Sequence, residues 1–133
     1  MNITNKREHW NAMIRNAREN TRTIDEKIDF LMNECIKQNL LSDPFFTRYI
    51  KGVCGSWRER KAWKTKSKEI RKRDGCCCWC SSEDNLGVHH IDPLINNWDL
   101  RLENSNLITL CPSCHKKAEN GSIPKEDLLK LIN

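Results

Sequence analysis

Four of the eight cysteines in this chain form two pairs with the same spacing. Two residues separate Cys77 from Cys80, and two separate Cys111 from Cys114. Cysteines at this spacing can bind one ion from a tight turn or from a helix N-terminus, and two such pairs complete a tetrahedral site of four thiolates, the usual geometry of structural Zn²⁺. One pair alone would also be compatible with a thiol redox motif. The two pairs together therefore predict a structural zinc site.

The other cysteines have no comparable spacing. Cys76 and Cys78 flank Cys77, but neither is three positions from Cys80, so they are not expected to bind the ion. Cys35 and Cys54 stand alone and are expected to pack as small apolar side chains. The N-terminus has no apolar segment that would serve as a secretion signal. This favours a reducing, cytoplasmic compartment, where paired cysteines more often bind metal than form disulfides.

Three histidines and an asparagine in the same half of the chain are suited to hydrolytic chemistry. Adjacent residues in a strand point to opposite faces, so one of His89 and His90 could bind a metal while the other acts as a base. His115 directly follows the last cysteine, and Glu119 lies one helical turn later, a spacing that suits two ligands of one ion. The side-chain carbonyl of Asn106 could fix the tautomer of a histidine. For each residue taken singly, a structural role is the alternative.

A small scaffold of strands and helices must bring these residues together. The two short apolar segments that flank the polar loop are expected to be antiparallel strands. A proline suits the first position of the helix that follows, and an Asn-Gly pair suits its end. The expected order is strand, loop, strand, helix and closing helix, over residues 86–91, 93–105, 107–110, 112–119 and 122–133.

A strongly basic segment precedes the cysteines and histidines. Residues 58–74 carry nine basic and three acidic side chains, in a chain whose net charge is +5. The sequence from Ser56 to Glu59 fits a capping box, so we expect a helix from Ser56 to about Arg73, with Gly75 near its C-cap. A basic stripe beside a group of metal ligands is typical of nucleic-acid-binding proteins. A solvated helix face would have the same composition.

The apolar residues of this basic helix indicate its buried face. Trp57, Ala62 and Trp63 would face a core, and the cations would then project outward.

Residues 1–55 are expected to form helices, and their sequence contains no pattern of catalytic or metal-binding residues. A capping box from Thr23 to Glu26 opens one helix, and Asp43-Pro44 fits the start of another. No stretch approaches the roughly 20 apolar residues that a membrane span needs. The chain is therefore expected to be α+β and mostly helical, with a helical extension over residues 1–55 and a second domain over residues 56–133.

Taken together, residues 56–120 resemble the HNH endonuclease family. The match lies in the order and spacing of four short motifs. These are Arg73-Asp74-Gly75, Cys77-x-x-Cys80, Val88-His89-His90-Ile91-x-Pro93, and the run from Asn106 through Cys111-x-x-Cys114-His115. The resemblance implies a ββα-metal (His-Me finger) core over residues 75–121 with a Cys₄ zinc site, as in small phage and restriction-type endonucleases. The basic helix, residues 56–74, would precede this core, and residues 122–133 would follow it.

The resemblance also implies a role for each candidate residue. His90 would be the general base that activates water, Asn106 would orient it, and His89 and His115 would bind a catalytic divalent ion. Where the family often has a further histidine, this chain has Glu119, whose carboxylate favours Mg²⁺ or Mn²⁺, with Ni²⁺ or Zn²⁺ as alternatives. The DNA-binding side chains would be Lys64, Lys68, Lys72, Arg73, Lys116 and Lys117.

The implied function is hydrolysis of DNA phosphodiester bonds, by nicking or double-strand cleavage, in the cytoplasm of a bacterium or of a phage-infected cell. Two alternatives stay open. A non-catalytic zinc-containing DNA-binding module would account for the cysteines and cations, but not for the adjacent histidines together with Asn106 and His115. An accessory protein of phage packaging, with terminase or portal proteins as partners, would keep the fold without the activity. Residues 1–55 resemble no family we can name, and they could dock a partner or clamp DNA.

Overall fold

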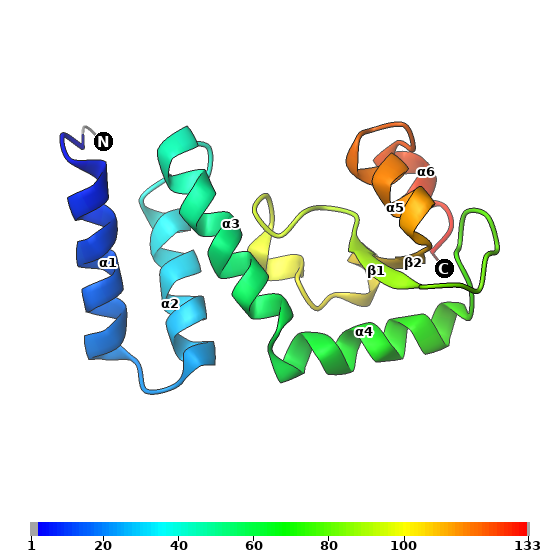
Figure 1. Cartoon of the computed structure of the whole chain (residues 1–133), viewed down its shortest axis with the longest axis horizontal. Helices are drawn as coiled ribbons and strands as arrows, with labels where there is room; N and C mark the ends of the chain where they lie inside the picture. Colours follow the sequence, from blue (N-terminus) through cyan, green and yellow to red (C-terminus); the bar gives the residue numbers. More distant parts are fainter. Residues whose placement is uncertain (1–2, 133) are drawn as a thin grey trace. The chain divides into compact units, whose positions relative to one another are not determined.

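The computed structural model describes residues 3–132 and divides into two compact units, Met1–Arg60 (unit 1) and Lys61–Asn133 (unit 2), both drawn in Figure 1. Within the described residues, only unit 2 contains a sheet. Over the same range, no helix combines the length and the apolar character that crossing a membrane would require.

Unit 1 is a bundle of three helices that lie side by side in Figure 1. Two of the helix starts confirm the sequence prediction. Thr23 and Glu26 form the capping box, and the carboxylate of Asp43 accepts a hydrogen bond from the backbone N–H of Phe45 at 2.9 Å. The helices are α1 (Lys6–Asn20), α2 (Ile24–Lys37) and α3 (Pro44–Arg58).

The predicted start of the basic helix at Ser56 is wrong. Helix α3 continues through Arg58, and α4 begins only at Lys61. The cause is burial: Ile50, Cys54 and Trp57 follow one another at helical spacing and are all buried, so α3 extends to the end of this apolar stripe. The Ser56 carbonyl accepts from the backbone N–H of Glu59 in the last turn of α3, so no capping box forms there.

Unit 2 is built around a two-stranded antiparallel sheet. His90 lies opposite Leu107 in the register, and His89 lies opposite Ile108. Helix α4 packs on one face of the sheet and α5 on the other, as Figure 1 shows. This confirms the α+β fold and the strand–strand–helix order of a ββα-metal core. The elements are α4 (Lys61–Asp74), β1 (Gly87–His90), β2 (Leu107–Leu110), α5 (Pro112–Glu119) and α6 (Lys125–Leu129).

The α4 helix is tied to the sheet by packing and by hydrogen bonds. Its buried face carries Trp63, Ser67 and Ile70. At its end, the carboxylate of Asp74 accepts from the backbone N–H of Thr109 in β2 at 2.9 Å. The next residue, Gly75, has φ +75°, a conformation that favours glycine and that ends the helix as predicted. The basic helix is therefore an integral part of unit 2.

The loop between the strands is more ordered than the sequence suggested. It contains two 3₁₀ turns, Trp98–Leu100 and Asn104–Asn106. Burial explains this order, because the side chains of Leu94 and Trp98 are each only 2% exposed. The closing helix, α6, is shorter than the range predicted for it, because it begins only after Pro124.

Candidate functional site

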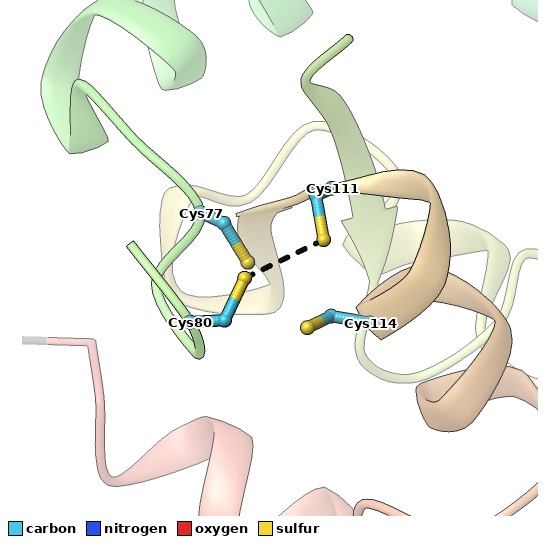
Figure 2. A group of neighbouring side chains, drawn as sticks. All are labelled: Cys77, Cys80, Cys111 and Cys114. Carbon is cyan, nitrogen blue, oxygen red and sulfur yellow. Dashed lines mark hydrogen bonds between the residues drawn. The ribbon is translucent and has the colours of Figure 1, made fainter. Parts of the chain in front are cut away.

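The four paired cysteines lie together at the base of α5. Cys77 and Cys80 come from the loop after α4, Cys111 is the N-cap of α5, and Cys114 lies in its first turn (Figure 2). Their sulfur atoms all lie within 4.8 Å of one another, and those of Cys80 and Cys111 are 3.6 Å apart. Four thiols that converge from one tight turn and one helix N-terminus fit the tetrahedral geometry of structural zinc.

Hydrogen bonds and burial shift the pKa of Cys77 in opposite directions, but they both raise the pKa of Cys114. Burial alone would raise the pKa of Cys77, but hydrogen bonds from the backbone N–H groups of Cys80, Cys111 and Trp79 outweigh it and lower the pKa to about 6. The pKa of Cys114 is raised, first by burial and then by its hydrogen bonds with the other thiols. One thiolate therefore opposes the ionisation of its neighbours, and a bound cation would remove that opposition.

The two flanking cysteines are not members of this group. The backbone N–H of Cys78 donates to the Thr109 carbonyl at 3.0 Å, which ties the loop to β2. Burial, followed by the charge of Asp74, raises the pKa of the Cys78 thiol to about 11.

A second group of possible ligands lies on the α5 face of the sheet. One ligand atom from each of His89, His115 and Glu119 lies within 4.8 Å of the others. The His89 and His115 rings meet edge to face with centroids 4.9 Å apart, and His115 Nε2 lies 3.1 Å from the Glu119 carboxylate. Two imidazoles and a carboxylate are a donor set that suits a hard or borderline divalent ion.

The protonation of His89 also suits metal binding. Burial is the main cause that lowers its pKa, to about 4, and electrostatic interactions with His115, His90 and Lys125 add to the effect. Because His89 is 9% exposed and neutral at pH 7, a ring nitrogen can offer its lone pair to an ion.

His90 points to the opposite face of the sheet, toward α4. Its imidazole stacks on the indole of Trp63, with ring centroids 4.5 Å apart and an interplanar angle of 27°. Its Nε2 lies 3.0 Å from the backbone carbonyl of Arg101. Because a carbonyl can only accept, Nε2 carries a proton, and in the neutral ring the lone pair lies on Nδ1. The two adjacent histidines are thus separated between the two faces of β1.

The structure gives Asn106 a different contact from the one expected. Its side-chain carbonyl accepts from the backbone N–H of Asp92 at 2.7 Å, and its amide donates to the Asp92 and Leu100 carbonyls. Asn106 therefore holds the turn that follows His90 and not the imidazole itself. The carbonyl that sets the tautomer belongs to Arg101.

The predicted DNA-binding cations fall into two groups. Five of them are lysines of α4 or α5, whereas the sixth, Arg73, is also exposed but has its guanidinium bound within unit 2. Arg73 donates to the Asp74 carboxylate at 2.8 and 3.1 Å, and to the carbonyls of Asn104 and Leu107 at 3.0 and 2.6 Å. These bonds join α4 to the segment that leads into β2. The five exposed lysines are Lys64, Lys68, Lys72, Lys116 and Lys117.

Sequence reasoning did not assign three residues that the structure places near these groups. The helical spacing of Trp63 predicts only a core residue. It does not reveal that the His90 imidazole stacks on the indole. The contact made by the Arg101 backbone carbonyl could not be predicted, because every residue type has a backbone carbonyl. Lys125 lies 3.4 Å from the Asp92 carboxylate, and its charge acts on His89. Its position at the start of α6, far along the chain from His89, gave no indication of this.

A two-stranded sheet followed by a helix, with a four-cysteine group at the base of that helix, defines the ββα-metal class of fold. Residues 76–121 match the family model described as HNH endonuclease, which confirms the resemblance for this segment. The match covers about a third of the chain and does not include α4 or unit 1. The comparisons with curated proteins and with solved structures each found no match.

Proposed function

We propose that this protein is a metal-dependent endonuclease that hydrolyses phosphodiester bonds of DNA. The division of adjacent histidines between the two faces of β1 is the observation that supports this function. His89 lies with His115 and Glu119, whereas His90 lies next to this group but outside it. Hydrolysis of a phosphodiester is served by such an arrangement, because the base is not a ligand of the ion and yet is the direct neighbour of a ligand in β1.

His90 is the proposed general base. Arg101 holds the Nε2 proton, so the attacking water would transfer its proton to Nδ1. The imidazolium that results keeps its hydrogen bond to the Arg101 carbonyl. Asn106 contributes by fixing the backbone of Asp92, two residues after the base.

His89, His115 and Glu119 are the residues that would hold the catalytic ion, with Mg²⁺ or Mn²⁺ favoured by the carboxylate and Ni²⁺ or Zn²⁺ as alternatives. When bound, such an ion supplies Lewis-acid stabilisation of charge on the phosphate and on the leaving 3′ oxygen. The expected products carry a 5′-phosphate and a 3′-hydroxyl.

The cysteines and lysines would serve these residues indirectly. The four cysteines would hold a structural Zn²⁺ that fixes the start of α5, and with it His115. The exposed lysines of α4 and α5 would contact DNA phosphates, so most of the affinity would not depend on sequence. Arg73 is not included, because its guanidinium binds Asp74 and two backbone carbonyls.

A plasmid-nicking assay tests the proposal. The zinc-loaded full chain should nick or cut supercoiled plasmid with Mg²⁺ or Mn²⁺ and should stop in EDTA. His90→Ala should lower the rate about 10²–10⁴-fold, the usual cost of losing a general base, with zinc content and circular dichroism unchanged. His9→Ala is the matched control, because His9 lies in unit 1, where its Nε2 contacts Gln38. Full activity of His90→Ala would contradict the role of the base.

The same assay separates the other functions. Tight DNA binding without any cleavage, in all four metals, would favour a non-catalytic zinc module. Neither binding nor cleavage would favour an accessory protein, and co-purification with terminase or portal proteins would then be the next measurement.

A further inference from the structure

The indole of Trp63 touches the imidazole of the proposed base. Trp63 is 8% exposed and lies on the buried face of α4, and the His90 ring is 7% exposed. The 27° angle between the two rings and the 4.5 Å between their centroids describe a face-to-face stack and not an edge contact. The imidazole therefore lies flat on the indole.

Two contacts from different elements act on this imidazole. The stack fixes the plane of the ring, and the hydrogen bond from Nε2 to the Arg101 carbonyl at 3.0 Å fixes its rotation within that plane. A single hydrogen bond to the Arg101 carbonyl does not set the tilt of the ring about the hydrogen-bond axis, whereas a stacked indole does. Removal of the flat surface beneath the ring would therefore change the direction of the Nδ1 lone pair, even with Nε2 still bound.

We propose that Trp63 is a positioning residue for the nuclease reaction, which holds the His90 imidazole in the plane needed to accept a proton from the attacking water. This inference rests on the proposed function. It also assigns α4 a second task beside DNA contact: its outer face carries the lysines, and its inner face supports the base. Trp63 lies outside the residues that match the HNH family model, so the base depends on a helix that the match does not include.

Two variants of Trp63 separate stacking from space filling. Phenylalanine keeps a flat ring, whereas leucine keeps apolar volume without one. At saturating Mg²⁺ we expect Trp63→Leu to lower kcat of plasmid nicking about 10- to 100-fold with KM nearly unchanged, because small misplacements of a reacting group have effects of this size. Trp63→Phe should recover most of kcat.

A spectroscopic measurement reports the stack directly. In zinc-loaded protein labelled at the histidine rings, the indole should shift the His90 ring C–H resonances upfield by its ring current. Trp63→Leu should abolish this shift, while the His9 and His115 resonances keep their positions.

Two controls exclude a general loss of structure. Ile70→Val removes one methylene from the same buried face of α4, and Trp10→Leu removes an indole of similar burial that stacks on Tyr49 in unit 1. Both should keep the kcat of the unmodified protein.

The outcomes are distinct. An active protein whose Trp63→Leu variant keeps full kcat would overturn the role of Trp63 and leave the proposed function standing, as would His90 resonances that do not move in that variant. An unmodified protein that cuts no DNA would overturn the proposed function, and this inference with it.

Discussion

The two adjacent histidines show how one residue position decides a role. In β1, His89 and His90 differ by one place in the chain and therefore face different helices. His89 contacts His115 of α5, and His90 contacts Trp63 of α4. A one-residue shift of register would exchange these surroundings and place the proposed base in the metal group. The register is thus as important to the proposed chemistry as the residue types.

Glu119 is the residue whose role in metal binding can be tested most directly. If its carboxylate binds the ion, Glu119→Ala should raise the Mg²⁺ concentration that gives half-maximal nicking, and added Mg²⁺ should partly restore the rate, because binding and not base chemistry is lost. Glu119→His should shift the preference toward softer ions such as Ni²⁺ or Zn²⁺. The measurement is a metal titration of the nicking rate.

Glu126→Ala is a suitable control for Glu119, because Glu126 is another exposed glutamate of unit 2 and lies outside the metal group. A titration curve of Glu119→Ala that superimposes on that of the unmodified protein would show that His89 and His115 bind the ion without it. Exposed substitutions on a helix usually change stability by no more than about 0.5 kcal/mol, so a folding defect is not expected to confuse the result.

At the scale of the element, α4 is expected to provide much of the affinity for duplex DNA. Neutralised phosphates release counterions, so log affinity falls with log salt concentration at a slope of about −0.9 per contact. Changing Lys64, Lys68 and Lys72 to Gln should flatten this slope and weaken binding to all sequences alike, as measured by fluorescence anisotropy from low to high salt. Lys37→Gln with Lys51→Gln, two exposed lysines of unit 1, is the control. An unchanged slope in the α4 variant would mean that its cations are only solvated.

The start of α3 should respond to pH. A hydrogen bond from Lys6 is the main cause that lowers the pKa of Asp43, and the backbone N–H groups of Phe45 and Phe46 add to it. The pKa of the Asp43 carboxyl is therefore lower in the folded chain than in the unfolded chain, where it is about 3.9. The stability that Asp43 contributes is present above that value and is lost as pH falls through the folded pKa.

Urea unfolding followed at the Ile50 methyl resonance can check this. Asp43→Ala should be less stable than the unmodified chain at pH 7, and the difference should shrink by pH 3. Asn5→Ala removes the N-cap of α1, whose amide does not titrate, so its effect should stay constant over the same range. Parallel pH dependence of the two variants would contradict the role of the Asp43 charge.

Features that depend on contacts between residues close in the chain could be predicted from the sequence, whereas features that depend on distant contacts could not. Pro112 and the Thr23–Glu26 capping box are local signals, and both predicted their helix starts correctly. The apparent capping box at Ser56 failed because the burial of Trp57 in α3 outweighed a local preference. The stack of Trp63 on His90 joins residues far apart in the chain, and no local pattern encodes it. The cysteine pairs were predictable because two short spacings imply one ion.

At the scale of the whole molecule, the four cysteines should contribute folding free energy to unit 2. Cys111→Ser should unfold this unit, because a structural zinc site stabilises only the folded chain. Elemental analysis should find about one zinc per chain, retained in mild EDTA that stops nicking. Cys54→Ser, at a buried cysteine of unit 1, is the control, and this variant should still contain about one zinc per chain, bound in unit 2. A folded, zinc-free Cys111→Ser protein would contradict the assignment.

Helix α5 joins the two groups of ligands, because Cys114 and His115 are consecutive residues. One of the four thiols, Cys80, is exposed, so oxidants and electrophiles can reach it without unfolding the chain. Oxidation there would release the start of α5 and move His115 away from His89, although no residue of the proposed reaction had been modified. Such an inactivated protein would not recover on addition of Mg²⁺, and it would need a thiol reductant together with zinc. The proposed nuclease would therefore lose its activity under oxidative stress.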